Sequence, residues 1–301
     1  MKLIRNMIVK HWDQNAIQDR NRKASQTPVS GITKHVDIPY LPDSLRDHLL
    51  DIYYPENTRS PLPVIVDIHG GGWMYGNKEL NEYYCLYLAS LGFAVVNINY
   101  RLAPAVHISE QISDIFAALR WLQQNGQSYF CDTENYFICG DSAGGHLSAL
   151  TAAIQASESL QKVYQVEPCG TAAKAVGISC GVFDLSMLYN TFHPLKREMG
   201  MIILGDKPRR SPYYSRINLK DIIAGLKLPP FHLVSCEADS LHPQSVAFDA
   251  LLTQNNVDHA VSFWSLTDGP DLTHVFNILY PQRKESAAAI NAMADFFRKQ
   301  L

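Results

Sequence analysis

The sequence predicts an α/β fold of the doubly wound class, built around a mostly parallel central sheet. Helical periods separate most of its strand candidates, and the clearest period runs from Ile112 to Leu122. Strands that are buried on both faces and alternate with helices form parallel sheets, so we expect helices on both sides. The strand candidates are apolar segments rich in β-branched residues and bounded by Gly, Pro or Asp: residues 49–54, 64–68, 93–98, 136–139, 175–179, 232–235 and 260–264.

Composition indicates one ordinary globular domain. The 301 residues, 47% of them hydrophobic, are enough for a single large core, so we expect one domain over residues 1–301. A net charge of -3 argues against a nucleic-acid partner. No apolar run approaches the roughly 20 residues that cross a bilayer. The N-terminus lacks a small-residue cleavage site, and we therefore expect a cytoplasmic protein without a membrane span.

The cysteines are predicted to be buried free thiols. They show neither a C-x-x-C motif nor the His/Cys spacing of a metal site. We therefore expect no metal at them. They are Cys85, Cys131, Cys139, Cys169, Cys180 and Cys236.

A serine stands where a predicted strand turns sharply into a helix. The run Gly140–Gly145 reads GDSAGG, follows the apolar strand candidate 136–139 and precedes a stretch of small residues. This G-x-S-x-G pattern is typical of a nucleophile elbow, in which a Cβ at the flanking glycines would collide with the neighbouring strand or helix. The pattern predicts that Ser142 is an exposed nucleophile.

A glycine loop follows the strand candidate 64–68 and reads HGGGW over residues 69–73. Its amides can face an oxyanion, and we expect those of Gly70 and Gly71, with that of Ala143, to form an oxyanion hole. A phosphate-binding loop is excluded because no Lys-Ser/Thr follows the glycines and no G-x-G-x-x-G opens a helix. Either motif alone is weak, but the two together, in this order, predict acyl transfer.

The chain resembles the hormone-sensitive-lipase-like, or bacterial type IV, esterases of the α/β-hydrolase superfamily. The matching segments run from about position 50 to the C-terminus: His69–Gly72, Asn99–Pro104, Gly140–Gly145 and the neighbourhoods of Asp239 and His274. The resemblance implies an α/β-hydrolase fold with a small helical cap, which we expect from about residues 1–45 and 183–225. It also implies a small-molecule ester substrate, no cofactor and a possible homodimer. If the cap forms, Trp12, Met199 and Ile202 are candidate pocket walls.

His274 is the predicted general base. A serine hydroxyl needs a base to become nucleophilic near neutral pH, and imidazole is suited to that task. His274 lies in a polar loop between the last strand candidate and the final helix, where this fold delivers its base. Structural roles are expected for four other histidines: His69, His146, His232 and His259.

Asp239 is the predicted partner of His274. It follows the strand candidate 232–235 and lies between the serine and the histidine in sequence, giving the order Ser, Asp, His. Asp268 and Asp271 are also candidates because they are close to His274 in sequence. Asp141 is less favoured, since a side chain adjacent to Ser142 should diverge from it.

These residues favour a serine carboxylesterase that hydrolyses short-chain esters through an acyl-enzyme. Four aromatic residues are candidates to narrow its acyl pocket: Trp73, Tyr83, Tyr84 and Phe183. Residues 49–55 also resemble esterases that act on acetylated or feruloylated sugars, which remain an alternative. Two further classes fit less well: a peptidase of the prolyl-oligopeptidase type, for whose propeller the chain has no room, and a non-catalytic hydrolase-fold binding protein.

Overall fold

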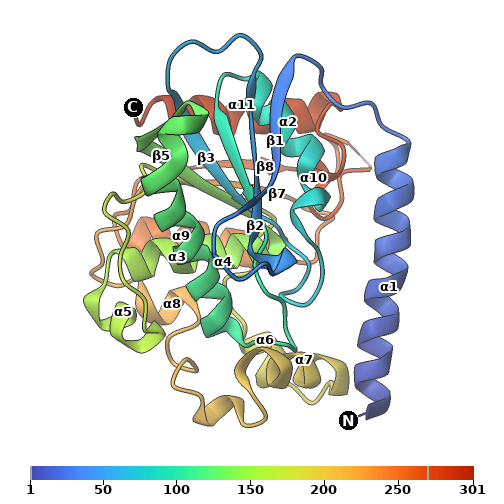
Figure 1. The fold of residues 1–301 in the computed structure, drawn as a ribbon. Coiled ribbons are helices and arrows are strands. Elements are labelled where there is room, and N and C mark those ends of the chain that lie inside the picture. The colour runs from blue at the N-terminus through green and yellow to red at the C-terminus, as the bar shows by residue number, and fades with distance from the viewer. Residues whose placement is uncertain (1, 270) are drawn as a thin grey trace.

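A computed structural model describes residues 2–269 and 271–301 (Figure 1). Its centre is an eight-stranded sheet in the order β1-β2-β4-β3-β5-β6-β7-β8. β2 is antiparallel to both β1 and β4, and all other neighbours are parallel, which confirms the predicted fold class. The strands are β1 (Ile32–Pro39), β2 (Leu49–Pro55), β3 (Leu62–Ile68), β4 (Ala94–Ile98), β5 (Cys131–Asp141), β6 (Val176–Ser179), β7 (Phe231–Cys236) and β8 (His259–Trp264).

Helices cover both faces of the sheet (Figure 1). Val64 and Val66 belong to the core cluster that includes α3, α4 and α9, whereas Ile65 belongs to the cluster with α2 and α11. Alternate side chains of one strand therefore enter opposite cores. The helices are α1 (Lys2–Ala24), α2 (Glu82–Ser90), α3 (Ile108–Asn125), α4 (Ser142–Gln155), α5 (Glu158–Tyr164), α6 (Ser186–Tyr189), α7 (Pro194–Leu204), α8 (Leu219–Ile222), α9 (His242–Gln254), α10 (Phe276–Leu279) and α11 (Lys284–Arg298), with 3-10 turns η1 (Arg46–His48), η2 (Lys78–Leu80), η3 (Gly126–Tyr129) and η4 (Pro208–Arg210).

The N-terminal segment divides into a helix and an edge strand. We expected residues 1–45 to belong to a cap, but Ile32–Pro39 pairs with β2 as the first strand of the sheet. The sequence pattern did not predict this strand because an edge strand needs only partial burial and therefore need not form an apolar run. β1 is accordingly polar and half exposed. Helix α1 lies outside the sheet and packs against α7 in a cluster that includes Ile8 and Ile202. None of the helices within the described ranges combines the length and apolarity needed to cross a bilayer.

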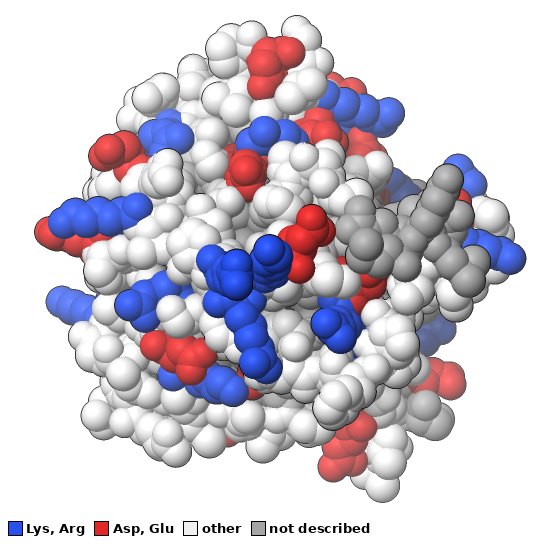
Figure 2. All heavy atoms as spheres, turned by 90° about the horizontal axis from the view of Figure 1, so that it is seen from below, with Lys and Arg blue, Asp and Glu red and all other residues white. Residues whose placement is uncertain are grey.

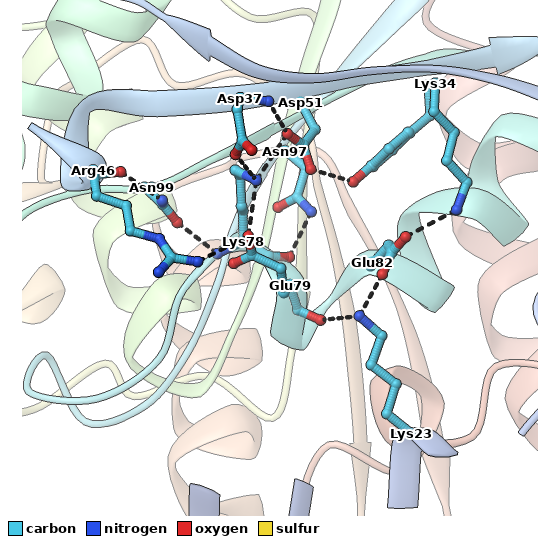
Figure 3. Close-up of polar contacts among 11 residues, drawn as sticks. Lys23, Lys34, Asp37, Arg46, Asp51, Lys78, Glu79, Glu82, Asn97 and Asn99 are labelled. Atoms are coloured by element: carbon cyan, nitrogen blue, oxygen red, sulfur yellow. Dashed lines mark hydrogen bonds and ion pairs between the residues drawn. The ribbon is translucent and has the colours of Figure 1, made fainter. Parts of the chain in front are cut away.

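A buried lysine connects the edge of the sheet to the segment before α2 (Figure 3). The Lys78 ammonium lies 2.8 Å from a carboxylate oxygen of Asp37, 2.8 Å from one of Asp51 and 2.9 Å from one of Glu79. Its side chain is only 2% exposed and that of Asp51 only 4%. The Asp37 amide also donates to Asp51, so the cluster holds β1, β2 and η2 together.

The same region holds α1 in place. Lys23, in the last turn of α1, donates to the Glu79 carbonyl at 3.1 Å and pairs with the Glu82 carboxylate. Glu82 also pairs with Lys34 of β1 at 2.9 Å (Figure 3). One acidic side chain of α2 therefore connects α1 to the edge strand.

We predict that Lys78→Met lowers the free energy of unfolding by about 3–5 kcal/mol, because it leaves the buried carboxylate of Asp51 without its cation. The matched control is Lys34→Met, whose side chain is 38% exposed, and it should cost under about 1 kcal/mol. Urea denaturation followed by circular dichroism measures both. Equal, small losses would show that Lys78 does not stabilise the edge of the sheet.

Candidate active site

The turn between β5 and α4 presents the Ser142 side chain at the carboxyl edge of the sheet. Ser142 has a φ of 50°, in the left-handed region that costs a non-glycine residue roughly 1–2 kcal/mol. The packing around it leaves no room for side chains. A Cβ on Gly144 would collide with the Ile68 carbonyl oxygen, and one on Gly140 would lie 2.6 Å from the Gly144 oxygen.

The three residues of the predicted relay meet at this edge. His274 Nε2 lies 3.0 Å from Ser142 Oγ, and His274 Nδ1 lies 2.9 Å from Asp239 Oδ2. Asp239 is buried, and its Oδ1 accepts a hydrogen bond of 2.9 Å from the Leu241 amide. The chain thus brings together side chains 132 and 35 residues apart in sequence.

The two carboxylates closer to His274 in sequence do not contact it in the described part of the chain. Asp268 accepts hydrogen bonds from the amide and hydroxyl of Ser265, in its own exposed turn. No hydrogen bond or ion pair joins Asp271 to His274 among the described residues. Asp239 is therefore the carboxylate in a position to orient the imidazole.

Electrostatics give the histidine the character of a base. Burial alone would lower the pKa of His274, but the hydrogen bond to Asp239 and its charge, with a smaller contribution from Asp141, raise the pKa above the ordinary 6.5. Burial would likewise raise the pKa of Asp239, yet the contact with His274 and the Leu241 amide hold it below 3.8. A proton on the imidazole is therefore stabilised by the carboxylate.

The predicted oxyanion donors need one correction. The Gly70 amide donates to Asp141 Oδ1 at 3.0 Å, and the same oxygen accepts from Asn81 Nδ2 at 2.8 Å. Gly70 is therefore not free to meet an oxyanion, and that prediction is wrong. The cause is a buried carboxylate next to Ser142, whose contact with residue 70 no local sequence pattern indicates.

The amides of Gly71 and Gly72 are the available donors of the loop. Both residues line the cavity at Ser142, and both have left-handed backbones with φ of 106° and 60°. Within the described residues no acceptor is bonded to either amide. The Ala143 amide lies in the first turn of α4, where helix amides lack intrahelical partners. Gly72 is the donor that the sequence analysis missed, although the third glycine of the motif was visible.

A cavity of about 470 Å³ opens beside Ser142 and His274. Helix α1 forms one wall of it. Trp12 stacks on Tyr75, just after the glycine loop, with ring centroids 5.1 Å apart, and the Tyr75 hydroxyl donates a hydrogen bond of 2.8 Å to Asp19. Arg22 donates to the Leu279 carbonyl at 2.7 Å and so closes the far end. The residues of α1 that line the cavity are His11, Trp12, Asn15, Gln18, Asp19 and Arg22.

None of the four aromatic residues predicted for the acyl pocket lines this cavity, so that prediction is wrong. Trp73 and Tyr84 are buried in the core, and the rings of Trp73 and His146 make a T-shaped contact. Phe183 stacks on Phe248 with ring centroids 4.0 Å apart, and Tyr83 lies under the Lys23 ammonium. Of the candidate cap residues, Trp12 does line the cavity, while Met199 and Ile202 pack in the cluster behind α1.

Several other histidines have structural partners, as expected. His69 Nδ1 lies 2.8 Å from the Gly70 carbonyl oxygen, and its ring stacks on Tyr100. His146 contacts the Ile217 carbonyl oxygen at 2.8 Å, and His232 contacts the Ser262 hydroxyl at 3.2 Å. Burial lowers the pKa of each of these three histidines to about 4, so they are neutral. His259 contacts Asp249 at 3.0 Å.

The cysteines are free and buried, as predicted. One of them, Cys180, lies beside the relay: its sulfur, an Asp239 oxygen and a His274 nitrogen lie within 4.8 Å of one another. These are potential metal ligands, but Asp239 is already hydrogen-bonded to His274, and the other ring nitrogen of His274 contacts Ser142. The carboxylate and the imidazole are therefore engaged in the relay.

Comparison with known proteins assigns the chain to a family. The family model BD-FAE matches residues 50–252, which include the glycine loop, the elbow and Asp239. The chain belongs to the BD-FAE family. Together with the similarity to several esterases, this match confirms the predicted relationship to hormone-sensitive-lipase-like esterases and the α/β-hydrolase fold.

This BD-FAE chain is 33% identical to esterase B from Lactobacillus rhamnosis, solved with a tributyrin phosphonate inhibitor, with a TM-score of 0.95 over 100% of this chain and 96% of that one. Over 86% of this chain it is 30% identical to esterase LipQ of Mycobacterium tuberculosis. The chain spans 61% of LipQ and 57% of LipM, a probable carboxylic ester hydrolase of the same organism. An esterase of the bacterial hormone-sensitive lipase family shares the fold, with a TM-score of 0.70 over 92% of this chain and 87% of that one, at 21% identity.

We predict that NMR titration of His274 gives a pKa above 6.5 and that Asp239→Asn moves this pKa downward. The physical reason is that the variant removes the negative charge and the charge-assisted hydrogen bond that stabilise the imidazolium. Asp249→Asn is the matched control, because Asp249 contacts His259 and not the relay. An unchanged His274 pKa in Asp239→Asn would contradict the assigned contact.

Proposed function

We propose that this protein is a serine carboxylesterase that hydrolyses short-chain acyl esters through an acyl-enzyme intermediate. The observation that carries the proposal is the continuous contact from Ser142 through His274 to Asp239, beside a cavity lined by free amides. The esterase relatives support the same activity.

In the first half of the reaction, Ser142 Oγ attacks the ester carbonyl carbon while His274 Nε2 accepts the hydroxyl proton. The carbonyl oxygen becomes an oxyanion, and the amides of Gly71, Gly72 and Ala143 donate hydrogen bonds to it. Asp239 holds the second imidazole nitrogen and balances the positive charge. His274 then gives the proton to the leaving alcohol, and the acyl group stays on Ser142.

In the second half, water replaces the alcohol. His274 accepts a proton from the water as its oxygen attacks the acyl carbon, and the same amides stabilise the second oxyanion. The bond to Ser142 Oγ breaks, the serine takes the proton back from His274, and the carboxylic acid leaves. These steps require the imidazole to be neutral, so kcat/KM should fall as the pH drops below the His274 pKa.

The size of the cavity favours small esters. A volume of about 470 Å³ lies in the lower part of the usual range for ligand pockets, and Trp12 and Tyr75 close part of it. The tributyrin phosphonate of the similar esterase B carries four-carbon acyl groups, which supports a short-chain preference.

Acetate esters are a second candidate class of substrate. The chain is 27% identical to a versiconal hemiacetal acetate esterase of Dothistroma septosporum, over 73% of this chain and 72% of that protein. Acetylated or feruloylated sugars remain the alternative substrates from the sequence. Initial rates on p-nitrophenyl esters of increasing acyl-chain length, compared with rates of acetate release from acetylated sugars, distinguish simple short-chain esters from sugar esters as substrates. The predicted cytoplasmic location and homodimer stay predictions.

We predict that Ser142→Ala lowers kcat on p-nitrophenyl butyrate by about five to six orders of magnitude, because it removes the attacking oxygen. Its melting temperature should stay close to that of the native chain, since alanine needs no more space. Ser148→Ala, which changes a buried serine six residues further along α4, is the control and should retain most activity. Wild-type turnover by Ser142→Ala would refute the proposed mechanism.

A further inference from the structure

The cap segment carries a group of basic side chains that ester hydrolysis does not use. Arg197 in α7, Lys207 and the η4 residues Arg209 and Arg210 line one hollow of about 870 Å³. We call these four residues, together with Phe192, the basic cap surface. Figure 2 views the molecule from below and shows Lys and Arg side chains gathered near the centre of this face.

Positive charge is in excess at this surface. Four cations line the hollow, and Asp206 is the carboxylate among the residues that line it with them. Arg209 donates to the side-chain oxygen of Asn190 at 3.1 Å, and this acceptor is neutral. In a chain whose net charge is -3, this is a local concentration of positive charge that attracts an anionic partner.

An aromatic side chain projects from the same surface. Phe192 is completely exposed, with an accessibility of 104% of its reference value, and it lies just before α7. Water is an unfavourable environment for a whole phenyl ring, so burial of Phe192 in a partner would favour binding. Tyr189 and Tyr214, whose rings meet at 4.9 Å, line the hollow beside it.

We propose that the basic cap surface docks the protein onto an anionic lipid membrane. Cations beside an exposed aromatic ring are the combination that binds lipid interfaces, because the cations attract acidic headgroups while the ring enters the acyl boundary. A soluble polyanion would pair with the cations but leave Phe192 in water. The membrane therefore accounts for both features.

The same cap layer reaches the cavity. Helix α7 packs against α1 through Met199 and Ile202, which contact the cluster containing Ile8 and Trp12. Trp12 lines the cavity beside Ser142. Membrane docking through α7 would place a wall of the cavity next to the source of lipid esters, and this last consequence rests on the proposed function.

Vesicle sedimentation tests the docking without reference to activity. We expect binding to phosphatidylcholine vesicles that contain about one-third phosphatidylglycerol, none to pure phosphatidylcholine, and weaker binding when NaCl rises from about 0.1 M to about 0.5 M. The double variant Arg209→Glu/Arg210→Glu should bind at least about 100-fold more weakly, and Phe192→Ser about tenfold. Ser142→Ala should bind as the native chain does, which separates this test from that of the proposed function.

The matched control is Lys162→Glu/Lys174→Glu, which reverses two exposed lysines outside the basic cap surface and should bind like the native chain. Thermal unfolding followed by circular dichroism verifies that each double variant is folded. Absence of vesicle binding, or equal loss in both double variants, would overturn the proposal. Binding to heparin without binding to vesicles would assign the surface to a soluble polyanion and would also overturn it.

Discussion

The site depends on one buried carboxylate that joins its two halves. Asp141 stands next to Ser142 at the end of β5, and its Oδ1 accepts hydrogen bonds from the Gly70 amide and the Asn81 side chain. The elbow and the glycine loop come from neighbouring parallel strands, β5 and β3, but the strands alone do not fix the distance between them. The Asp141 contacts fix that distance. The amides of Gly71 and Gly72 are thus set in place before any charge develops on a substrate.

Close packing reinforces this connection. A Cβ on Gly144 would strike the Ile68 carbonyl, and one on Gly70 would strike the Asp141 side chain. Glycine is required at these two positions because other chain segments occupy the space of a side chain. The left-handed Ser142 is held in its strained conformation by these surroundings, with its hydroxyl 3.0 Å from His274 Nε2.

The helix α1 depends on contacts of a different kind. Lys23 holds its last turn to Glu79 and Glu82, and Arg22 holds it to the Leu279 carbonyl. The N-terminal half of α1 is held by the apolar cluster in which Ile8 packs with Ile202 of α7. The cavity wall is therefore a separately attached element, and its polar residues are suited to set substrate preference without changing the relay.

The sequence predicted those features that a motif and the order of a fold determine. Ser142, His274 and Asp239 follow from the elbow and from the loops that this fold places at one edge of the sheet. Three predictions failed because each feature depends on a distant partner. The Gly70 amide is bonded to the Asp141 carboxylate, Tyr84 packs in the core between α2 and α11, and β1 pairs with the edge of β2. Glycine spacing does not reveal which amide is already bonded. Aromatic residues near a motif are equally useful to the core, and an edge strand lacks an apolar run.

The most direct measurement is a crystal structure of the protein after reaction with a short alkyl phosphonate. We expect a covalent bond from phosphorus to Ser142 Oγ, with the phosphoryl oxygen bonded to the amides of Gly71, Gly72 and Ala143 while the Gly70 amide stays on Asp141. Phosphorus on another residue, or a phosphoryl oxygen bonded to Gly70 with the Asp141 contact broken, would contradict the assigned nucleophile or the assigned oxyanion hole.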